Sequence, residues 1–226
     1  MNIHFIGIIH SDPLGSERLW NALSYEKPKA IAVECSQELR KYLVSGRWLR
    51  EEKRVFKKYR KKGISEFAYQ QVIRELVDMM FEVRVSLSYG RSQDIPVHLI
   101  DSKRVYDEIV KRHKNHQVRR LSDISYRTRE IRKQEAEISY YDFGKLFDGS
   151  ISDSLDREFS IALDQNDNFK DRDDRAEEKI RNLEYDKIVV VYGLAHCLHD
   201  ANGNSLFSRL QDLNPTRKTL GWYDHR

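Results

Sequence analysis

Three short, nearly continuous apolar runs constrain the fold of this chain more than any other feature of its sequence. They occupy residues 2–9 (NIHFIGII), 30–33 (AIAV) and 187–192 (KIVVVY). Runs of this kind, rich in Val and Ile, are typical of strands that are buried on both faces of a parallel sheet. Helical patterns lie between them. The sequence therefore predicts an α/β fold with a mostly parallel sheet core built from βαβ units.

Two further segments are predicted to be strands. Residues 96–100 (PVHLI) share the apolar pattern, and residues 218–222 (KTLGW) are expected to form an edge strand. A helix that ends at Lys27-Pro28 joins the first two strands, because the residue before a proline disfavours the helical conformation. Residues 2–34 are thus predicted to form one right-handed βαβ unit.

The remaining sequence is helical and highly charged, and it lies between the strands. Its length of 226 residues suits one domain. We therefore predict a single α/β domain over residues 1–226, with a large helical cap formed by insertions at about 37–92 and 103–165.

The net charge of +4 is unevenly distributed. The segment from Arg40 to Lys62 holds eleven Lys or Arg and two Glu, so the rest of the chain is net acidic. Basic side chains interleaved with Trp48, Phe56 and Tyr59 can bind phosphates and stack on bases, which makes nucleic-acid binding an alternative function. A solvated helix face explains the same pattern, and we favour that interpretation.

Several classes of protein are disfavoured by what the sequence lacks. No apolar run reaches the roughly 20 residues needed to span a membrane, and the residues MNIHF do not open like a secretory signal. Cys35 and Cys197 are too few for a disulfide framework, which favours a cytoplasmic location. There is also no P-loop, dinucleotide-binding glycine motif or serine-hydrolase elbow.

Histidine and carboxylate side chains follow four of the predicted strands. Ligands of parallel α/β sheets bind beyond the carboxyl ends of the strands. Histidines and carboxylates together can hold a divalent metal ion, and an open position would let a bound water act as the nucleophile. The residues are His10, Glu34, Asp101 and His196, and both histidines arrive in a Gly-x-x-His frame that begins at Gly7 or Gly193.

Each of these residues also has a purely structural interpretation. A single histidine after a strand is usually a hydrogen-bonding residue. Glu34 could cap the following helix, and Asp101 could act as the N-cap of the next one. The coincidence of four strand ends is what favours a functional site.

At these residues the sequence resembles the TraB/PrgY/GumN/Tiki family of the erythromycin-esterase/ChaN-like superfamily. Residues 7–10 (GIIH) and 28–34 (PKAIAVE) are similar to its first Gly-x-x-His strand end and its Pro-x-x-Val-x-x-Glu strand. Asp101 matches the Asp that ends its middle strand. Residues 171–173 (DRD) are similar to its Glu-Arg-Asn/Asp motif, with Asp171 in place of Glu, and residues 193–196 (GLAH) to its second Gly-x-x-His motif.

The resemblance implies a metal-dependent hydrolase of a peptide or ester bond. Tiki members are thought to be metal-dependent proteases that rely on the paired Gly-x-x-His motifs. TraB and PrgY are linked to shutting down peptide pheromones, and ChaN-like relatives bind haem. A peptide or small-molecule substrate is therefore expected, and the alternative is a non-catalytic protein that sequesters a peptide, haem or a small ligand in the same crevice.

We expect the following roles for the site residues. His10 and His196 hold a divalent ion such as Mn, Co or Zn, with Glu34 as third ligand or general base and Asp101 as ligand or supporting residue. Arg172 binds a substrate carboxylate or oxyanion, or else forms an ion pair with Glu34 or Asp101. The residues expected to support the site are Gly7, Gly193, Asp171 and Asp173, the last as a helix cap.

Overall fold

The computed structural model describes residues 1–47, 50, 54, 66, 80–103, 107, 129–149, 167–200 and 202–225. Most of the basic segment from Arg40 to Lys62 lies outside these residues, and so does much of both predicted helical insertions. In the described part of the chain, no helix is both long enough and apolar enough to cross a membrane.

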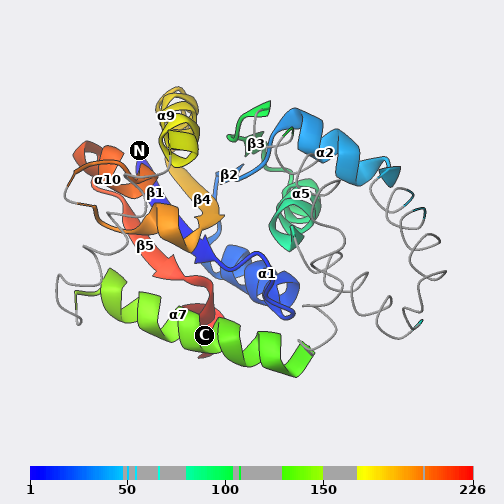
Figure 1. Cartoon of the computed structure of the whole chain (residues 1–226). Coiled ribbons are helices and arrows are strands. Elements are labelled where there is room, and N and C mark those ends of the chain that lie inside the picture. Colours follow the sequence, from blue (N-terminus) through cyan, green and yellow to red (C-terminus); the bar gives the residue numbers. More distant parts are fainter. Residues whose placement is uncertain are drawn as a thin grey trace.

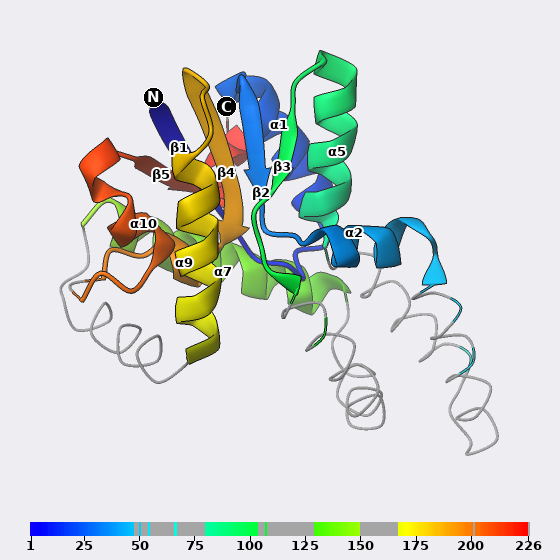
Figure 2. The same ribbon diagram turned by 90° about the horizontal axis from the view of Figure 1, so that it is seen from above.

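Five parallel strands form one sheet in the spatial order β3-β2-β4-β1-β5 (Figure 1). The arrows of β2, β3 and β4 point the same way in Figure 2. The predicted parallel α/β fold is confirmed, and the three apolar runs are the three central strands. The strands are β1 (Asn2–Ile8), β2 (Ala30–Val33), β3 (Val97–Leu99), β4 (Lys187–Gly193) and β5 (Thr216–Thr219).

Helices cover both faces of the sheet. α1 (Gly15–Glu26) and α5 (Phe81–Gln93) pack on one face, and α9 (Asp167–Arg181) and α10 (Leu206–Arg209) on the other (Figure 2). α7 (Arg129–Phe147) packs against β5 and a 3-10 helix that follows it. The remaining elements are α2 (Gln37–Val44), η1 (Leu194–Cys197), η2 (Gln211–Leu213) and η3 (Leu220–His225).

The central strands feed two apolar cores, one on each face. Ile6 and Val191 belong to the core beneath α1 and α5, whereas Phe5, Val190 and Tyr192 belong to the core beneath α9 and α10. Successive side chains of a strand point to opposite faces. Since both faces are covered, apolar residues occupy neighbouring positions of these strands, which explains why their sequences are nearly continuous runs.

The edge strand β5 differs from its prediction. It spans Thr216–Thr219 instead of residues 218–222, and Leu220–His225 forms η3. The strand sequence is TRKT, which carries no apolar run. An edge strand has one neighbour and leaves its side chains partly exposed, so hydrophobicity does not mark its position.

The helices between the strands refine the prediction of an inserted cap. α5 packs on α1 and β2, so it is the crossover helix that leads from β2 to β3. α7, which lies within the second predicted insertion, continues through Gly144 to Phe147. The residues of both predicted insertions therefore include helices that belong to the α/β core.

Candidate functional site

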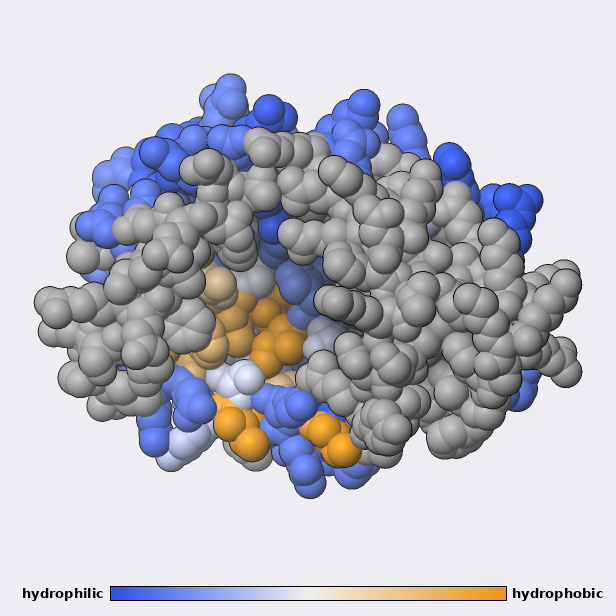
Figure 3. All heavy atoms as spheres, viewed as in Figure 1, coloured by the Kyte–Doolittle hydropathy of each residue, from blue (hydrophilic) through white to orange (hydrophobic). Residues whose placement is uncertain are grey.

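The site lies at the point of the sheet from which successive strands are added in opposite directions. β2 and β4 are neighbours, but β2 leads outward to β3 whereas β4 leads to β5 at the opposite edge. Such a switch point opens a crevice beyond the strand ends. Glu34 follows β2 and His196 follows β4, while His10 follows β1 on the other side of β4. Figure 3 views the molecule from the same side as Figure 1. It shows a hollow near the centre of the molecule, where apolar side chains lie beside polar ones.

Gly193 is the point at which three of the predicted site residues converge. Its backbone N–H donates a 2.6 Å hydrogen bond to Oε2 of Glu34. A β-carbon placed on Gly193 would lie 3.3 Å from Glu34 Oε2, 3.3 Å from His10 Nε2 and 3.7 Å from His196 Cδ2. The missing side chain thus leaves room for His10, Glu34 and His196 to surround one small volume.

Gly7 has a different role from Gly193, although both begin a Gly-x-x-His frame. Gly7 lies opposite Tyr192 in the sheet and Ile8 lies opposite Gly193, so the two frames are offset in register. A β-carbon on Gly7 would lie 2.6 Å from Cδ2 of Leu194 and 3.3 Å from the ring of Phe147. Gly7 therefore allows close apolar packing and does not face the histidines.

A buried carboxylate lies beside the Nδ1 atom of each histidine. Nδ1 of His10 forms a 3.0 Å hydrogen bond with Oε1 of Glu82 on α5. Nδ1 of His196 lies 2.7 Å from Oδ1 of Asp173 on α9, which is an ion-pair distance without the alignment of a hydrogen bond. Glu82 and Asp173 are 1% and 0% exposed. The helical layers on opposite faces of the sheet each orient one histidine, an arrangement typical of metal-binding and catalytic histidines.

His10 and Glu34 form a charged pair at neutral pH. The His10 side chain is 40% exposed, but its Nε2 lies 3.6 Å from Oε2 of Glu34. Burial of the ring lowers the pKa of His10, but Glu82 and Glu34 outweigh this effect and raise the pKa to about 9. Burial raises the pKa of Glu34, but Arg172, His10 and His196 outweigh it and lower the pKa to about 2.

Arg172 on α9 lies between two buried carboxylates. Its Nη2 contacts Oε1 of Glu34 and lies 3.1 Å from Oδ2 of Asp101, and its Nε lies 3.3 Å from Oδ1 of Asp101. The structure thus contains both ion pairs that the sequence offered as the alternative role of Arg172. The guanidinium fixes one oxygen of Glu34 and leaves the other to face the histidines.

Among the described residues, Asp101 is linked to the site through Arg172, which in turn contacts Glu34. Besides Arg172, its carboxylate accepts a 2.7 Å hydrogen bond from the backbone N–H of Ser102. Burial raises the pKa of Asp101, and Arg172 opposes that rise. Because both carboxylate oxygens of Asp101 are engaged in this way, we assign it the supporting role that the sequence left open, rather than the role of metal ligand.

Asp173 is not the helix cap that the sequence suggested. α9 begins at Asp167, so Asp173 lies inside the helix and faces the sheet. Its Oδ2 accepts a 2.9 Å hydrogen bond from the backbone N–H of Leu206, while Oδ1 faces His196. Asp171, by contrast, is exposed on α9.

Glu82 is the site residue that sequence reasoning missed. It stands in the segment FEVRVSL at the start of α5, where Phe81, Val83 and Val85 are buried. A carboxylate beside buried apolar neighbours was the available signal, since buried charges are rare unless paired. Its partner His10 lies far away in sequence, so periodicity alone could not identify the pair.

A second buried ion pair, also missed, fixes the loop that carries His10. Nη1 of Arg18 lies 2.9 Å from Oδ2 of Asp12, and both residues are buried. The Tyr140 hydroxyl donates to the same oxygen at 3.1 Å and accepts from the Ile9 N–H at 3.1 Å. The backbone is therefore held on both sides of His10.

The two cysteines take no part in the site chemistry. Both are buried free thiols. Burial raises the pKa of Cys35 to about 12, with further contributions from Glu82 and Asp101, and burial also raises the pKa of Cys197. Protonated, buried thiols behave as small apolar residues.

The donors can fit a divalent ion after a small rearrangement. Among the described residues, no three His, Cys, Asp or Glu side chains already form a metal-binding cluster. Two ligands of a tetrahedral zinc with bonds of about 2.0 Å lie about 3.3 Å apart. The separation of His10 Nε2 and Glu34 Oε2 is 3.6 Å. An ion at this position would replace the His10–Glu34 ion pair, with Cδ2 of the His196 ring on the third side.

The fold and the site together define a parallel α/β protein with a histidine–carboxylate centre at the switch point of its sheet. Comparisons of the chain with protein-family models, with curated proteins and with solved structures found no match. The family resemblance therefore rests on the motif residues alone.

Proposed function

We propose that this chain is a metal-dependent hydrolase of a peptide or ester bond, of the TraB/Tiki type. One observation carries the proposal: two histidines, each with a buried carboxylate within 3.0 Å of Nδ1, meet Glu34 at Gly193. Histidines that bind metal commonly donate their other N–H to a carboxylate, which fixes the ring and strengthens the ligand.

The roles of the residues follow from this geometry. His10, His196 and Oε2 of Glu34 are the proposed donors, a set that suits Mn, Co or Zn. A bound ion supplies a water whose pKa is lowered from 15.7 towards about 7. Arg172 keeps Glu34 ionised and oriented, because it occupies the oxygen that faces away from the histidines. Glu82 and Asp173 fix the rings from opposite faces of the sheet.

The proposal is tested by measuring metal uptake and hydrolysis in the same preparation. The full chain is stripped with a chelator, reloaded separately with Mn, Co and Zn, and analysed for bound metal. Each form is then assayed against a panel of short peptides and aryl esters. We expect one equivalent of metal and turnover that disappears on stripping. Metal uptake without turnover would instead support a binding protein, and a Soret band on haem addition would identify haem as its ligand.

The variant Glu82→Gln is expected to weaken metal binding by about 10- to 100-fold, as for other residues that orient metal ligands. Glutamine keeps the shape of the side chain but removes the charge that attracts the Nδ1 proton of His10. Affinity is measured by competition with a fluorescent chelator at fixed pH.

Ser86→Ala is the matched control for Glu82→Gln. Ser86 lies one turn further along α5, is fully buried, and its hydroxyl forms no hydrogen bond within the described residues. Its replacement is expected to change metal affinity less than twofold, since it alters packing near Glu82 but not the charge at His10. Equal weakening in the two variants would show that α5 acts through packing and not through the carboxylate.

A further inference from the structure

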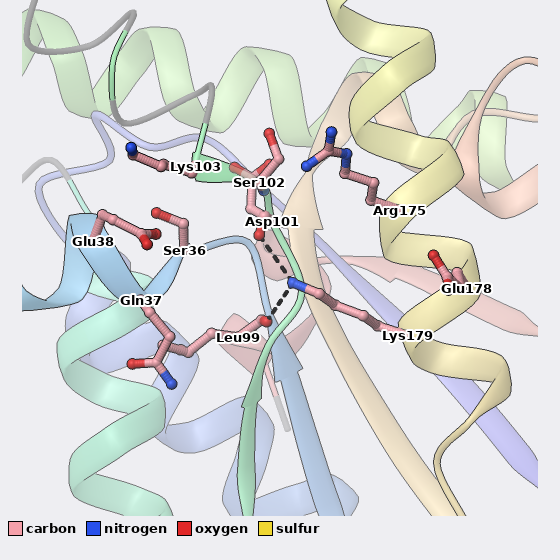
Figure 4. Close-up of a pocket in the computed structure, with 10 residues that line it drawn as sticks. All are labelled: Ser36, Gln37, Glu38, Leu99, Asp101, Ser102, Lys103, Arg175, Glu178 and Lys179. Atoms are coloured by element: carbon pink, nitrogen blue, oxygen red, sulfur yellow. Dashed lines mark hydrogen bonds between the residues drawn. The ribbon is translucent and has the colours of Figure 1, made fainter.

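A second concave feature adjoins the site on the side of β3. A pocket of about 410 Å³ opens between the start of α2 and the middle of α9, beyond the end of β3 (Figure 4). Asp101 borders both this pocket and the Arg172 cluster. The pocket is lined by Ser36, Gln37, Glu38, Leu99, Asp101, Ser102, Lys103, Arg175, Glu178 and Lys179.

The positive charges of this pocket are only partly neutralised. Among the described residues, neither Lys103 nor Arg175 forms a hydrogen bond or an ion pair. Nζ of Lys179 donates to two backbone carbonyls, of Leu99 at 3.1 Å and of Asp101 at 3.0 Å, and pairs with no carboxylate. Burial lowers the pKa of Lys179 and Arg175 lowers it further, against the influence of Asp101. Glu38, Asp101 and Glu178 supply as many negative charges to the lining, so the guanidinium of Arg175, rather than a net positive charge, is what could bind an anion.

The pocket also has a preferred end for such an anion. In Figure 4, the guanidinium of Arg175 points towards Ser102, whereas the ammonium group of Lys103 points away from both, to the side on which Glu38 lies. The carboxylates of Glu38 and Glu178 also line the pocket. They repel a ligand whose negative charge is spread out, and they favour a single compact anionic group beside Arg175 and Ser102.

α9 connects this pocket to the proposed catalytic centre. Arg172, Arg175 and Lys179 follow the i, i+3, i+7 spacing that places residues on one face of a helix. Each residue advances the helix by about 1.5 Å, so Arg175 is about 4.5 Å further along the axis than Arg172. A ligand anchored at Arg175 would thus lie one helical turn from the Arg172–Glu34 pair.

We propose that this pocket is a subsite for an anionic group of the substrate, a carboxylate or a phosphate, held by Arg175 and the Ser102 hydroxyl. Guanidinium groups bind both anions through paired hydrogen bonds. The link to catalysis rests on the proposed hydrolase function, whereas anion binding itself does not. The subsite would select substrates that carry a negative charge a few atoms from the bond that is cleaved.

Calorimetric titration of the full, metal-free chain tests the subsite without any turnover. Inorganic phosphate and succinate are titrated separately at the same ionic strength. We expect at least one of them to bind, and Arg175→Gln to weaken that binding about tenfold, the effect of losing one charge-assisted hydrogen bond. Glu178→Gln is expected to strengthen binding about twofold, because it removes a repulsive charge from the wall.

Lys170→Gln is the matched control, since it removes the same charge from an exposed position on α9 outside the pocket. It is expected to leave binding within about twofold. Preference for phosphate or for succinate then identifies the anionic group. The subsite is wrong if neither anion binds, or if Lys170→Gln and Arg175→Gln weaken binding equally. Either result would leave the metal and hydrolysis measurements unaffected, so the two proposals fail separately.

Discussion

Replacement of Arg172 by leucine is expected to lower the free energy of unfolding by about 3–5 kcal/mol, the usual cost of removing one partner from a buried ion pair. The side chains of Glu34 and Asp101 are 5% and 1% exposed, and Arg172 contacts both. Without the guanidinium, Asp101 would lose its ion pair and Glu34 would keep only its longer contact with His10, so two carboxylates would remain buried near each other with too little counter-charge. The loss is measured by urea unfolding at neutral pH, followed by circular dichroism.

Arg175→Leu is the control for the effect of charge and volume on α9. Arg175 lies one turn beyond Arg172 in the same helix, is exposed, and pairs with no described residue. Its replacement is expected to change stability by no more than about 0.5 kcal/mol. A similar loss in both variants would mean that α9 tolerates no leucine on this face, and the ion pairs would not explain the effect.

The difference between wild type and Arg172→Leu should also depend on pH. Arg172 lowers the pKa of Glu34 and opposes the burial that raises the pKa of Asp101. It therefore stabilises the ionised carboxylates of the folded protein. The pKa of Glu34 is about 2 when folded and about 4.3 in an unfolded chain. The contribution of this carboxylate is complete above about pH 5 and is lost as the pH falls towards 2. The unfolding curves of wild type and Arg172→Leu should therefore approach each other as the pH falls from about 5 towards 2.

The central part of the fold could be predicted because burial on both faces leaves a clear mark on the sequence. β1, β2 and β4 are the middle strands, and their apolar runs identify them. β5 has the sequence TRKT, and only its pairing with β1 makes it a strand. Strand order could not be predicted either, since β1, β2 and β4 have similar compositions and their neighbours are set by packing across the whole sheet.

The same contrast applies to the site. His10, Glu34 and His196 could be predicted because parallel strands all end at one edge, so residues after them are brought together by topology. Which side-chain atoms pair also depends on residues of the helices, and these partners could not be predicted from the sequence. Glu82 and Asp173 became partners of the histidines only when α5 and α9 packed on opposite faces. The two Gly-x-x-His frames are not equivalent in the structure, because the strand register places Gly193 at the site and Gly7 against Leu194.

Loss of either histidine is expected to reduce metal-dependent hydrolysis by at least about a thousandfold, since a bound ion stabilises the transition state by several kcal/mol. Glutamine is the better replacement at position 10, because its amide can still donate a hydrogen bond to the buried carboxylate of Glu82. His196→Gln serves in the same way beside Asp173. Activity and bound metal are measured in parallel, and circular dichroism verifies that each variant is folded.

His199→Ala is the control, because His199 is exposed and follows His196 closely in the chain. It should retain both metal and activity. The double variant His10→Gln with His196→Gln gives the sharper test. Two ligands of one ion act as a unit, so the second replacement should cost little once the first has removed the metal. Losses that multiply would mean that the histidines act independently, and the shared metal centre at Gly193 would be wrong even if both residues proved essential.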